Sequence, residues 1–149
     1  MEKSKTVKES YTEQCQIVFS EHINGNGRLF GGRLVEWMDV VAGVVARRHS
    51  EYEVTTVSID KVDFTAPANI NDLVIIIGKL IYVGNTSMAV KISTFVEKRN
   101  GERIQINSAV FILVALDEND KPTRVPRLTL VTEEEKKESQ EFENKKRNS

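Results

Sequence analysis

The sequence predicts an α+β fold in which one long helix is covered by one antiparallel sheet. The helix is expected from Arg33 to His49, where apolar residues recur at spacings of three and four positions. After Tyr52 the pattern changes to segments in which apolar and polar residues alternate, and turn residues separate these segments. The connections between the segments are short, and strands joined by short connections pair in antiparallel fashion.

One strand is expected before the helix and four after it. The first runs from Cys15 to Glu21, and Ile17 and Phe19 continue its apolar positions at every second residue. Turns are expected at Gly84-Asn85 and Asn100-Gly101, which separate consecutive strands. The four later strands are predicted at Val54–Phe64, Leu73–Val83, Ser87–Glu97 and Glu102–Leu116.

A chain of 149 residues is long enough for one domain with its own core. We expect a flexible N-terminus over residues 1–10, one domain over residues 11–127 and a charged tail over residues 128–149. From Thr132 onward the tail consists almost entirely of Glu, Lys, Asn, Gln and Ser, so a loose helix without an apolar face is the most it is expected to form.

Composition excludes several classes of function. The formal net charge is −1 with 29% charged residues, which does not favour binding to nucleic acid or to an anionic membrane. Cys15 is the one cysteine, so an intrachain disulfide and a cysteine-rich metal site are excluded, and we interpret it as an inert strand residue. No spacing of His, Cys, Asp or Glu indicates a metal site. The sequence contains no apolar run long enough to span a bilayer, and its start lacks the apolar core of a signal peptide, so we expect a cytoplasmic protein.

The stretch from Asn24 to Asp39 carries the clearest functional signal. A glycine-rich loop leads directly into the apolar helix, and glycines allow a ligand to approach the backbone closely. The helix N-terminus offers unpaired N–H groups and a positive dipole end, which suit a developing oxyanion. Asp39 then places a carboxylate on an apolar helix, which is costly unless the carboxylate has partners or a catalytic role. These three features together predict an active site.

The same residues carry a family resemblance. The pattern Asn24-x-Asn26-Gly27-x-x-Phe30-Gly31-Gly32, followed by Trp37-Met38-Asp39, closely resembles the YciA-type acyl-CoA thioesterases of the hotdog-fold superfamily. The resemblance covers about Tyr11 to Arg127 and continues through looser motifs: Thr56-Val57-x-x-Asp60-x-Val62-x-Phe64-x-x-Pro67, Val83-Gly84-x-Thr86-Ser87-Met88, Ala109-Val110-Phe111 and Val114-Ala115-Leu116-Asp117.

The resemblance implies a hotdog fold, in which a curved antiparallel sheet wraps around one central helix. It implies hydrolysis of acyl-CoA to a carboxylic acid and CoA, without a cofactor. It also implies a homodimer with sheets joined edge to edge, often assembled as a trimer of dimers.

The resemblance also implies catalytic roles. In the resembling family the acid at the position of Asp39 is the general base that activates water; the alternative is a structural carboxylate bonded to nearby backbone amides. The family places a functional asparagine at Asn24, whose amide would orient water or polarise the thioester carbonyl, whereas the alternative is an Asx turn. Asn26 precedes Gly27 in a favourable turn dipeptide, so we assign the functional role to Asn24.

The candidate binding residues each have a structural alternative. Gly31 and Gly32 would admit the acyl group and supply a backbone N–H to the oxyanion, or they serve tight helix packing. Phe30 would line the acyl pocket or belong to the core. The family places the CoA pantetheine arm beside the turn of Gly84, Thr86 and Ser87, which is otherwise an ordinary hairpin. CoA phosphates would meet a surface arginine, and the candidates are Arg124, Arg127, Arg99 and Arg103.

Two other functions remain open at this point. A non-catalytic acyl-CoA-binding hotdog protein would bind the ligand without hydrolysing it. A hotdog enoyl-CoA hydratase would need an acid and a base positioned across a double bond, and only one credible acid, Asp39, is present. His49 is interpreted as a residue of the last helical turn rather than a catalytic group.

Helix geometry further predicts that the active site is shared between two chains. Gly32 and Asp39 are two helical turns apart, about 10 Å along the axis. One helix cannot easily present both groups to a single carbonyl. Two antiparallel helices from two chains could do so.

Overall fold

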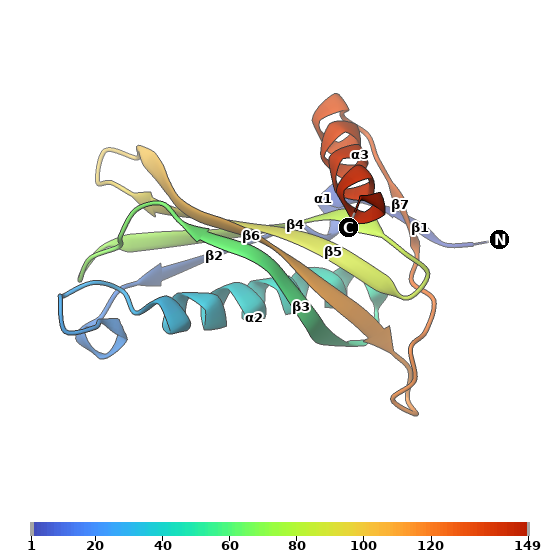
Figure 1. Cartoon of the computed structure of the whole chain (residues 1–149), viewed down its shortest axis with the longest axis horizontal. Coiled ribbons are helices and arrows are strands. Elements are labelled where there is room, and N and C mark those ends of the chain that lie inside the picture. The colour runs from blue at the N-terminus through green and yellow to red at the C-terminus, as the bar shows by residue number, and fades with distance from the viewer. Residues whose placement is uncertain (1, 149) are drawn as a thin grey trace.

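The computed structural model describes residues 2–148 and contains one long helix, α2 (Gly31–Ser50), lying across the concave face of a five-stranded antiparallel sheet (Figure 1). The strands follow the order β2-β4-β5-β6-β3. Their bounds are β2 Thr12–Ile17, β3 Glu53–Phe64, β4 Leu73–Val83, β5 Ser87–Glu97 and β6 Arg103–Leu116. The α+β prediction is therefore confirmed, and α2 and the four later strands begin and end within two residues of their predicted limits.

The helix approaches the sheet closely at Gly78 of β4. A Cβ at this position would lie 2.8 Å from Cγ1 of Val41 and 2.9 Å from Cγ2 of Val45, both on α2. Such distances are below normal van der Waals contact, so only glycine permits this separation between helix and sheet. The core between the two layers includes fully buried Met38, Leu80, Met88, Ile92, Phe111 and Leu113.

The C-terminal turn of α2 contains a buried histidine. His49 is fully buried, and its Nε2 lies 2.8 Å from the carbonyl oxygen of Pro126. Burial lowers the pKa of His49, which favours the neutral ring. This histidine therefore has a structural role, as expected, although it acts through its hydrogen bond rather than through a charge on the helix dipole.

The two ends of the chain differ from the expectation drawn from their polar composition. Residues 1–10 were expected to be frayed, but they form β1 (Ser4–Thr6), which pairs in parallel with β7 (Arg127–Thr129), and the short helix α1 (Val7–Ser10). Val7 is buried, so this segment contributes to the packing. The strand pairing joins residues more than 120 positions apart, and local composition cannot reveal such a contact.

The first strand of the large sheet also differs from its prediction. It begins at Thr12 and ends at Ile17, and a short 3-10 helix, η1 (Ser20–His22), follows it. Cys15 and Ile17 are exposed, because their side chains point to the face of the sheet opposite α2. The alternating pattern therefore identified the strand but not the face that it buries.

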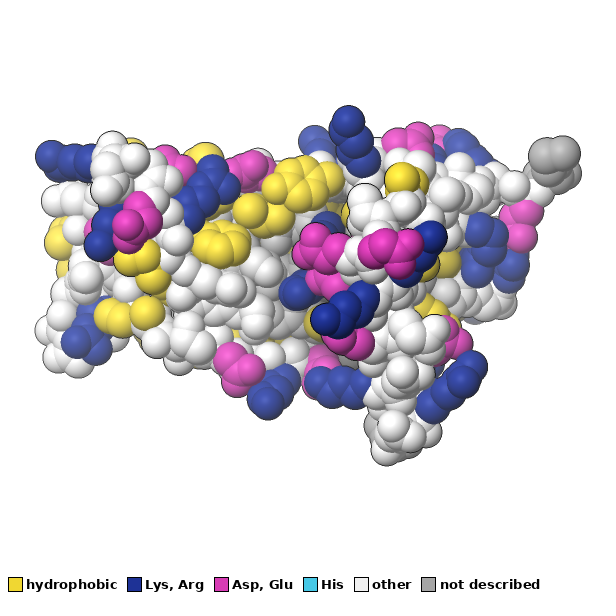
Figure 2. Space-filling view, turned by 90° about the horizontal axis from the view of Figure 1, so that it is seen from above, with side chains coloured by type: hydrophobic (Ala, Val, Ile, Leu, Met, Phe, Trp, Pro, Cys, Tyr) yellow, Lys and Arg dark blue, Asp and Glu magenta, His cyan; other side chains and the backbone are white. Residues whose placement is uncertain are grey.

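The tail forms a docked helix, α3 (Glu133–Arg147), on the outer face of the sheet (Figure 1). Its N-terminus is capped by the Thr132 hydroxyl, which accepts a hydrogen bond from the N–H of Glu135 at 3.1 Å. Glu138 forms ion pairs with Lys79 of β4 at 2.6 Å and Lys91 of β5 at 2.8 Å. Figure 2 shows the charged side chains gathered over this part of the surface.

A small aromatic contact completes the docking of α3. The ring of Phe142 lies 5.3 Å from that of Tyr82, and Lys145 pairs with Asp60 of β3 at 3.4 Å. The helix has no apolar face, as predicted, since Ser139 is the residue that it buries. The sequence did not indicate that one aromatic residue and a set of ion pairs would dock it on the sheet.

The pairing of Glu138 predicts a pH-dependent release of α3. Burial raises the pKa of this carboxyl, but hydrogen bonds from Lys79 and Lys91 outweigh burial and lower the pKa below the ordinary 4.5. A lowered pKa stabilises the docked state above about pH 4.5, and this contribution is lost as the pH falls through the lower folded value. We expect the protection factors of the α3 amides, which correct for the intrinsic exchange rate at each pH, to fall selectively below about pH 4.5.

The same contact can be tested at neutral pH. Glu138→Gln should lower the free energy of local opening of α3 by about 1–2 kcal/mol at pH 7, as expected for a charge-assisted hydrogen bond. Glu141→Gln, on an exposed glutamate of the same helix, is the control. Equal exchange rates in the two variants would show that the ion pairs do not hold the helix.

Candidate active site

The loop before α2 is organised by Asn24. Its side-chain Oδ1 accepts hydrogen bonds from the N–H groups of Asn26 at 2.8 Å and Arg28 at 3.3 Å. The Asx turn considered from the sequence is therefore present. Because the oxygen of the carboxamide holds the loop, the exposed Asn24 Nδ2 group remains available as a donor to a ligand.

The start of α2 presents backbone donors beside this loop. Phe30 is the N-cap residue, and the N–H groups of Gly31 and Gly32 belong to the first turn, where helical N–H groups have no intrahelical partner. A Cβ on Gly32 would lie 2.8 Å from the ring of Phe30, so the glycine allows this ring to fold over the helix start. Phe30 itself is 59% exposed, which places it at the surface and not in the core.

Asp39 lies near the middle of α2 and is half-buried. Its Oδ1 accepts a hydrogen bond of 2.6 Å from the hydroxyl of Thr56 on the neighbouring strand β3. This bond fixes the orientation of the carboxylate and leaves its second oxygen open. Thr56 was read from the sequence only as part of a strand-defining motif, because its place beside Asp39 depends on the packing of β3 against α2.

The candidate residues fall into separate groups along α2. Asn24, Gly31 and Gly32 lie where the helix begins, and Asp39 lies further along it (Figure 1). The turn between β4 and β5 lies at the other end, near Ser50 and Arg124. A helix of 20 residues is about 30 Å long. Within one chain, the structure therefore does not bring the turn and Arg124 near Asn24.

The residues of that turn are bonded within their own chain. Gly84 donates its N–H to the carbonyl of Ser87 at 2.9 Å, and Ala115 donates to the carbonyl of Thr86 at 3.1 Å. Arg127 donates to the Gly84 carbonyl at 2.8 Å. Arg124 bonds with Asn85 and with Glu2, and the bond with Glu2 raises the pKa of Arg124. In the single chain, these contacts match the hairpin alternative.

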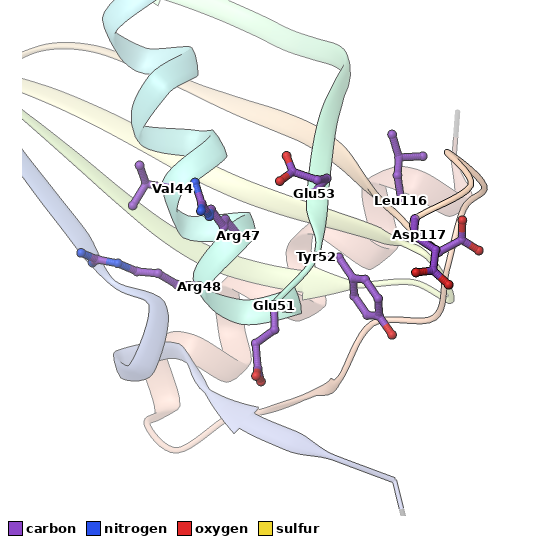
Figure 3. A pocket seen from close by; sticks show the side chains of 9 residues that line it. Val44, Arg47, Arg48, Glu51, Tyr52, Glu53, Leu116 and Asp117 are labelled. Carbon is purple, nitrogen blue, oxygen red and sulfur yellow. The ribbon is translucent and has the colours of Figure 1, made fainter.

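Two hollows lie at opposite ends of the helix. The first, of about 420 Å³, is lined by Asn24, Gly31 and Phe64 among others, so it adjoins the candidate oxyanion donors. The second, of about 990 Å³, is lined by Arg47, Tyr52 and other residues near the C-terminus of α2 (Figure 3). Asn24 lines the first hollow but not the second, and Asp39 lines neither of them.

The charged side chains that line the second hollow differ in whether they form hydrogen bonds or ion pairs within the chain. Figure 3 shows Arg48 pointing away toward the N-terminal segment, where it donates to the Tyr11 carbonyl at 3.1 Å. Glu51 pairs with Lys3 and Lys5, which lower the pKa of Glu51 to about 2. Within residues 2–148 the side chain of Arg47 makes no hydrogen bond or ion pair, so its charge is open to a ligand or to another chain.

An open surface runs along α2 and the free edge of β3. Among the described strands, β3 pairs only with β6, so its other edge is unpaired. Exposed apolar side chains lie on this edge and on the neighbouring helix: Phe30, Val40, Val57, Ile59 and Phe64. A Cβ on Gly43 of α2 would meet nothing within 4 Å. A monomer rarely exposes such a surface, and a long unpaired strand invites pairing with another chain.

Comparison with known proteins identifies the family. A family model described as the thioesterase superfamily matches residues 26–102. YkhA of Bacillus subtilis, named as an acyl-CoA thioester hydrolase, is 38% identical over 129 residues, which are 86% of this chain and 75% of YkhA. The chain belongs to the thioesterase superfamily. It is an acyl-CoA thioesterase, and the resemblance to YciA is confirmed, because YciA of Salmonella typhimurium is 32% identical over 69% of this chain and 80% of YciA.

Solved thioesterases share its fold. An apo-hexameric acyl-CoA thioesterase has a TM-score of 0.94 and 33% identity, covering 98% of this chain and 94% of that one. An acyl-CoA hydrolase of Staphylococcus aureus, crystallised with butyryl coenzyme A and coenzyme A, has a TM-score of 0.90 and 28% identity, covering 97% and 92%. That hydrolase was also solved as variants in which one asparagine, one aspartate or one threonine is replaced by alanine. The hotdog fold of this thioesterase is therefore established.

Among residues 2–148, no group of three or more His, Cys, Asp or Glu side chains could hold a metal ion. In the same range, no helix is both long enough and apolar enough to cross a bilayer.

Proposed function

We propose that each active site of this thioesterase is built from two chains, with Asp39 of one chain facing Asn24 and the start of α2 of its partner. The observation that carries this proposal is the position of Asp39. Its carboxylate is half-buried and opens beside the free edge of β3, away from the donors of its own helix start. A second helix packed antiparallel would bring the missing donors to it.

The proposed reaction needs no cofactor. Asp39 accepts a proton from water as the water oxygen attacks the thioester carbonyl carbon. The carbonyl oxygen gains negative charge, which the partner's Asn24 Nδ2 group and the N–H groups at Gly31 and Gly32 stabilise. The C–S bond then breaks, the proton on Asp39 passes to the departing sulfur, and the carboxylic acid and CoA are released.

The Staphylococcus aureus variants support this choice of residues. The altered asparagine, aspartate and threonine of that hydrolase are separated by 15 and 17 positions. Asn24, Asp39 and Thr56 have the same two separations in this chain. We therefore add Thr56 to the proposed site as a positioning residue that acts through Asp39.

The proposed assembly is a homodimer joined through β3. Antiparallel pairing of two β3 edges would bury Val57 and Ile59 and would extend the sheet across both chains. The hexameric state of the structural relatives supports a trimer of such dimers. We propose a cytoplasmic location, supported by the rat and mouse relatives named as cytosolic acyl coenzyme A thioester hydrolases.

The dimer would also unite the CoA-binding candidates with the catalytic loop. Antiparallel pairing places the Glu53 end of one β3 beside the Phe64 end of the other. The partner's loop would then lie near the hollow of Arg47, and toward the end of the helix that carries Gly84, Thr86, Ser87 and Arg124. We propose that the pantetheine arm and phosphates of CoA extend along this end of the partner chain.

A substrate panel tests the function itself. Saturated acyl-CoAs of increasing length and one 2-enoyl-CoA are incubated with the protein and a thiol reagent. A thioesterase releases CoA thiol from the saturated substrates. A hydratase would remove the double bond of the enoyl-CoA without releasing thiol, and a non-catalytic binder would change neither substrate.

Removal of the Thr56 hydroxyl should impair catalysis without removing the base. Thr56→Val keeps the shape of the side chain but leaves Asp39 without its 2.6 Å donor. We expect kcat to fall about tenfold while KM stays within twofold, and Thr56→Ser should retain most activity. Thr55→Val, on an exposed neighbour in β3, is the control. Equal activity of Thr56→Val and Thr56→Ser would contradict the positioning role.

The two asparagines of the loop can be separated by their effects on kcat. Asn24→Ala removes the proposed donor and should lower kcat by about 10²–10³, with a smaller effect on KM. Asn26→Ala should be milder and confined to the stability of the turn, because alanine keeps the backbone N–H that Asn26 donates to Asn24 Oδ1. If Asn26→Ala proved more damaging to kcat at unchanged stability, the functional asparagine would be Asn26.

A further inference from the structure

A second hollow adjoins the one at the catalytic loop. The hollow of about 420 Å³ beside Asn24 is called the loop hollow, and a neighbouring hollow of about 700 Å³ is called the distal hollow. Ala66, Pro67 and Ile106 line both of them, so the two hollows are neighbours that share one wall. Both are lined by residues at the end of the sheet where α2 begins.

A β-bulge creates the boundary between the two hollows. In the pairing of β5 with β6, Thr94 faces Asn107 and Phe95 faces Gln105, so Ile106 is left without a partner in β5. Such a bulge redirects a side chain, and Ile106 is only 2% exposed because it turns toward the interior. The N–H of Thr65 donates to the carbonyl of Ile106 at 2.8 Å, which fixes the following Ala66 and Pro67 over the bulge.

The distal hollow has apolar walls, formed by Ile17, Ile70, Leu73, Val96 and Ile104. Ile17, Ile70 and Ile104 are 47%, 41% and 38% exposed, so a ligand placed there would remove apolar surface from water.

The two acidic side chains around these walls accept hydrogen bonds from neighbouring groups of the chain. Asp72 accepts the N–H of Asn69 at 2.7 Å, and Glu97 accepts a bond from Arg103 at 3.0 Å. The lining also includes Asn69, Asn71, Lys98 and Arg99, so the part of the hollow that suits hydrocarbon is the wall formed by the apolar residues named above.

We propose that the distal hollow is the subsite for the far part of the acyl chain, and that the physiological substrates are therefore long-chain acyl-CoAs. This inference rests on the proposed function, which places the thioester carbonyl beside Asn24 and Gly31. The acyl chain then runs from the carbonyl through the loop hollow, passes Ile106 and enters the distal hollow. Each methylene group bound there contributes about fourfold to kcat/KM, the factor expected for transfer of one methylene from water.

Two variants test the path at two different points. Ala66→Trp fills the passage between the hollows, and Ile70→Asp places a charge in the distal hollow alone. Val131→Asp introduces the same charge at a side chain that is 62% exposed and lines neither hollow, so it is the control for Ile70→Asp. The kcat/KM values are measured for butyryl-, octanoyl- and tetradecanoyl-CoA.

We expect Ala66→Trp and Ile70→Asp to lower kcat/KM for tetradecanoyl-CoA by at least about tenfold. Ile70→Asp, which lies outside the loop hollow, should leave butyryl-CoA within twofold. Val131→Asp should leave the whole profile unchanged. If Ala66→Trp fails to fold, Ile70→Asp alone decides, because its side chain is already exposed. An unchanged preference for chain length in Ile70→Asp, or a wild-type protein that cleaves butyryl-CoA but not tetradecanoyl-CoA, would overturn the proposal. Absence of thiol release from every acyl-CoA would instead contradict the proposed chemistry.

Discussion

Asp39→Asn should lower kcat for acyl-CoA hydrolysis by about two to four orders of magnitude, which is the usual cost of losing a positioned general base. Asparagine has nearly the same shape as aspartate, and its carbonyl oxygen can still accept the hydrogen bond from Thr56. The variant therefore loses the proton acceptor while the helix and the strand stay in place. KM should change little, because the carboxylate is assigned to the water and not to CoA.

The control for this experiment lies on the same helix. Glu36 is an exposed carboxylate one turn before Asp39, and it pairs with Arg33 at 3.4 Å. Glu36→Gln removes an equal charge without touching the proposed site, so its kcat should stay within twofold of the wild type. Thermal unfolding of both variants checks that stability is preserved. Near-normal turnover by Asp39→Asn would exclude Asp39 as the base.

Sequence periodicity located most of the fold because most of its elements are amphipathic on their own. The residues of α2 repeat their apolar positions at helical spacing, and those of β4, β5 and β6 are bounded by clear turns. The ends of the chain lack such a signal. β1 is held in place by its pairing with β7. α3 is held in place largely by the ion pairs of Glu138 with Lys79 and Lys91. These are contacts between distant residues, to which local composition is insensitive.

The sequence likewise predicted part of the candidate site, namely the residues that lie close together in the chain. Asn24, Gly31 and Asp39 lie within one short segment, so the sequence alone predicts that they belong to one site. Thr56 lies 17 positions after Asp39 on another element, and only the packing of β3 beside α2 brings its hydroxyl to the carboxylate. The sequence also could not show that Arg124 lies at the opposite end of the helix from Asn24.

The separation of Asp39 from Asn24 within one chain leads to the second large expected effect, the recovery of activity by mixing two inactive proteins. Chains carrying Asn24→Ala keep Asp39, and chains carrying Asp39→Asn keep Asn24. In a dimer of one chain of each kind, the proposed geometry gives one site with both intact residues and one site with neither. If the chains reassort at random, half of the dimers are mixed, and half of their sites are intact. Activity should therefore recover to about a quarter of the wild-type value.

The experiment requires that the chains exchange. Each variant carries a different affinity tag, and the two are unfolded together in denaturant and refolded as a mixture. Tandem purification on both tags then isolates the mixed assemblies. Each variant unfolded and refolded alone is the control, and it should remain as inactive as before. Because β3 has one free edge and Asp39 opens beside it, the shared site predicts activity only in the doubly purified fraction. Mixed assemblies that form but remain inactive would show that each site is built within a single chain. In that case Asp39 and Asn24 of one chain would have to act on the same thioester.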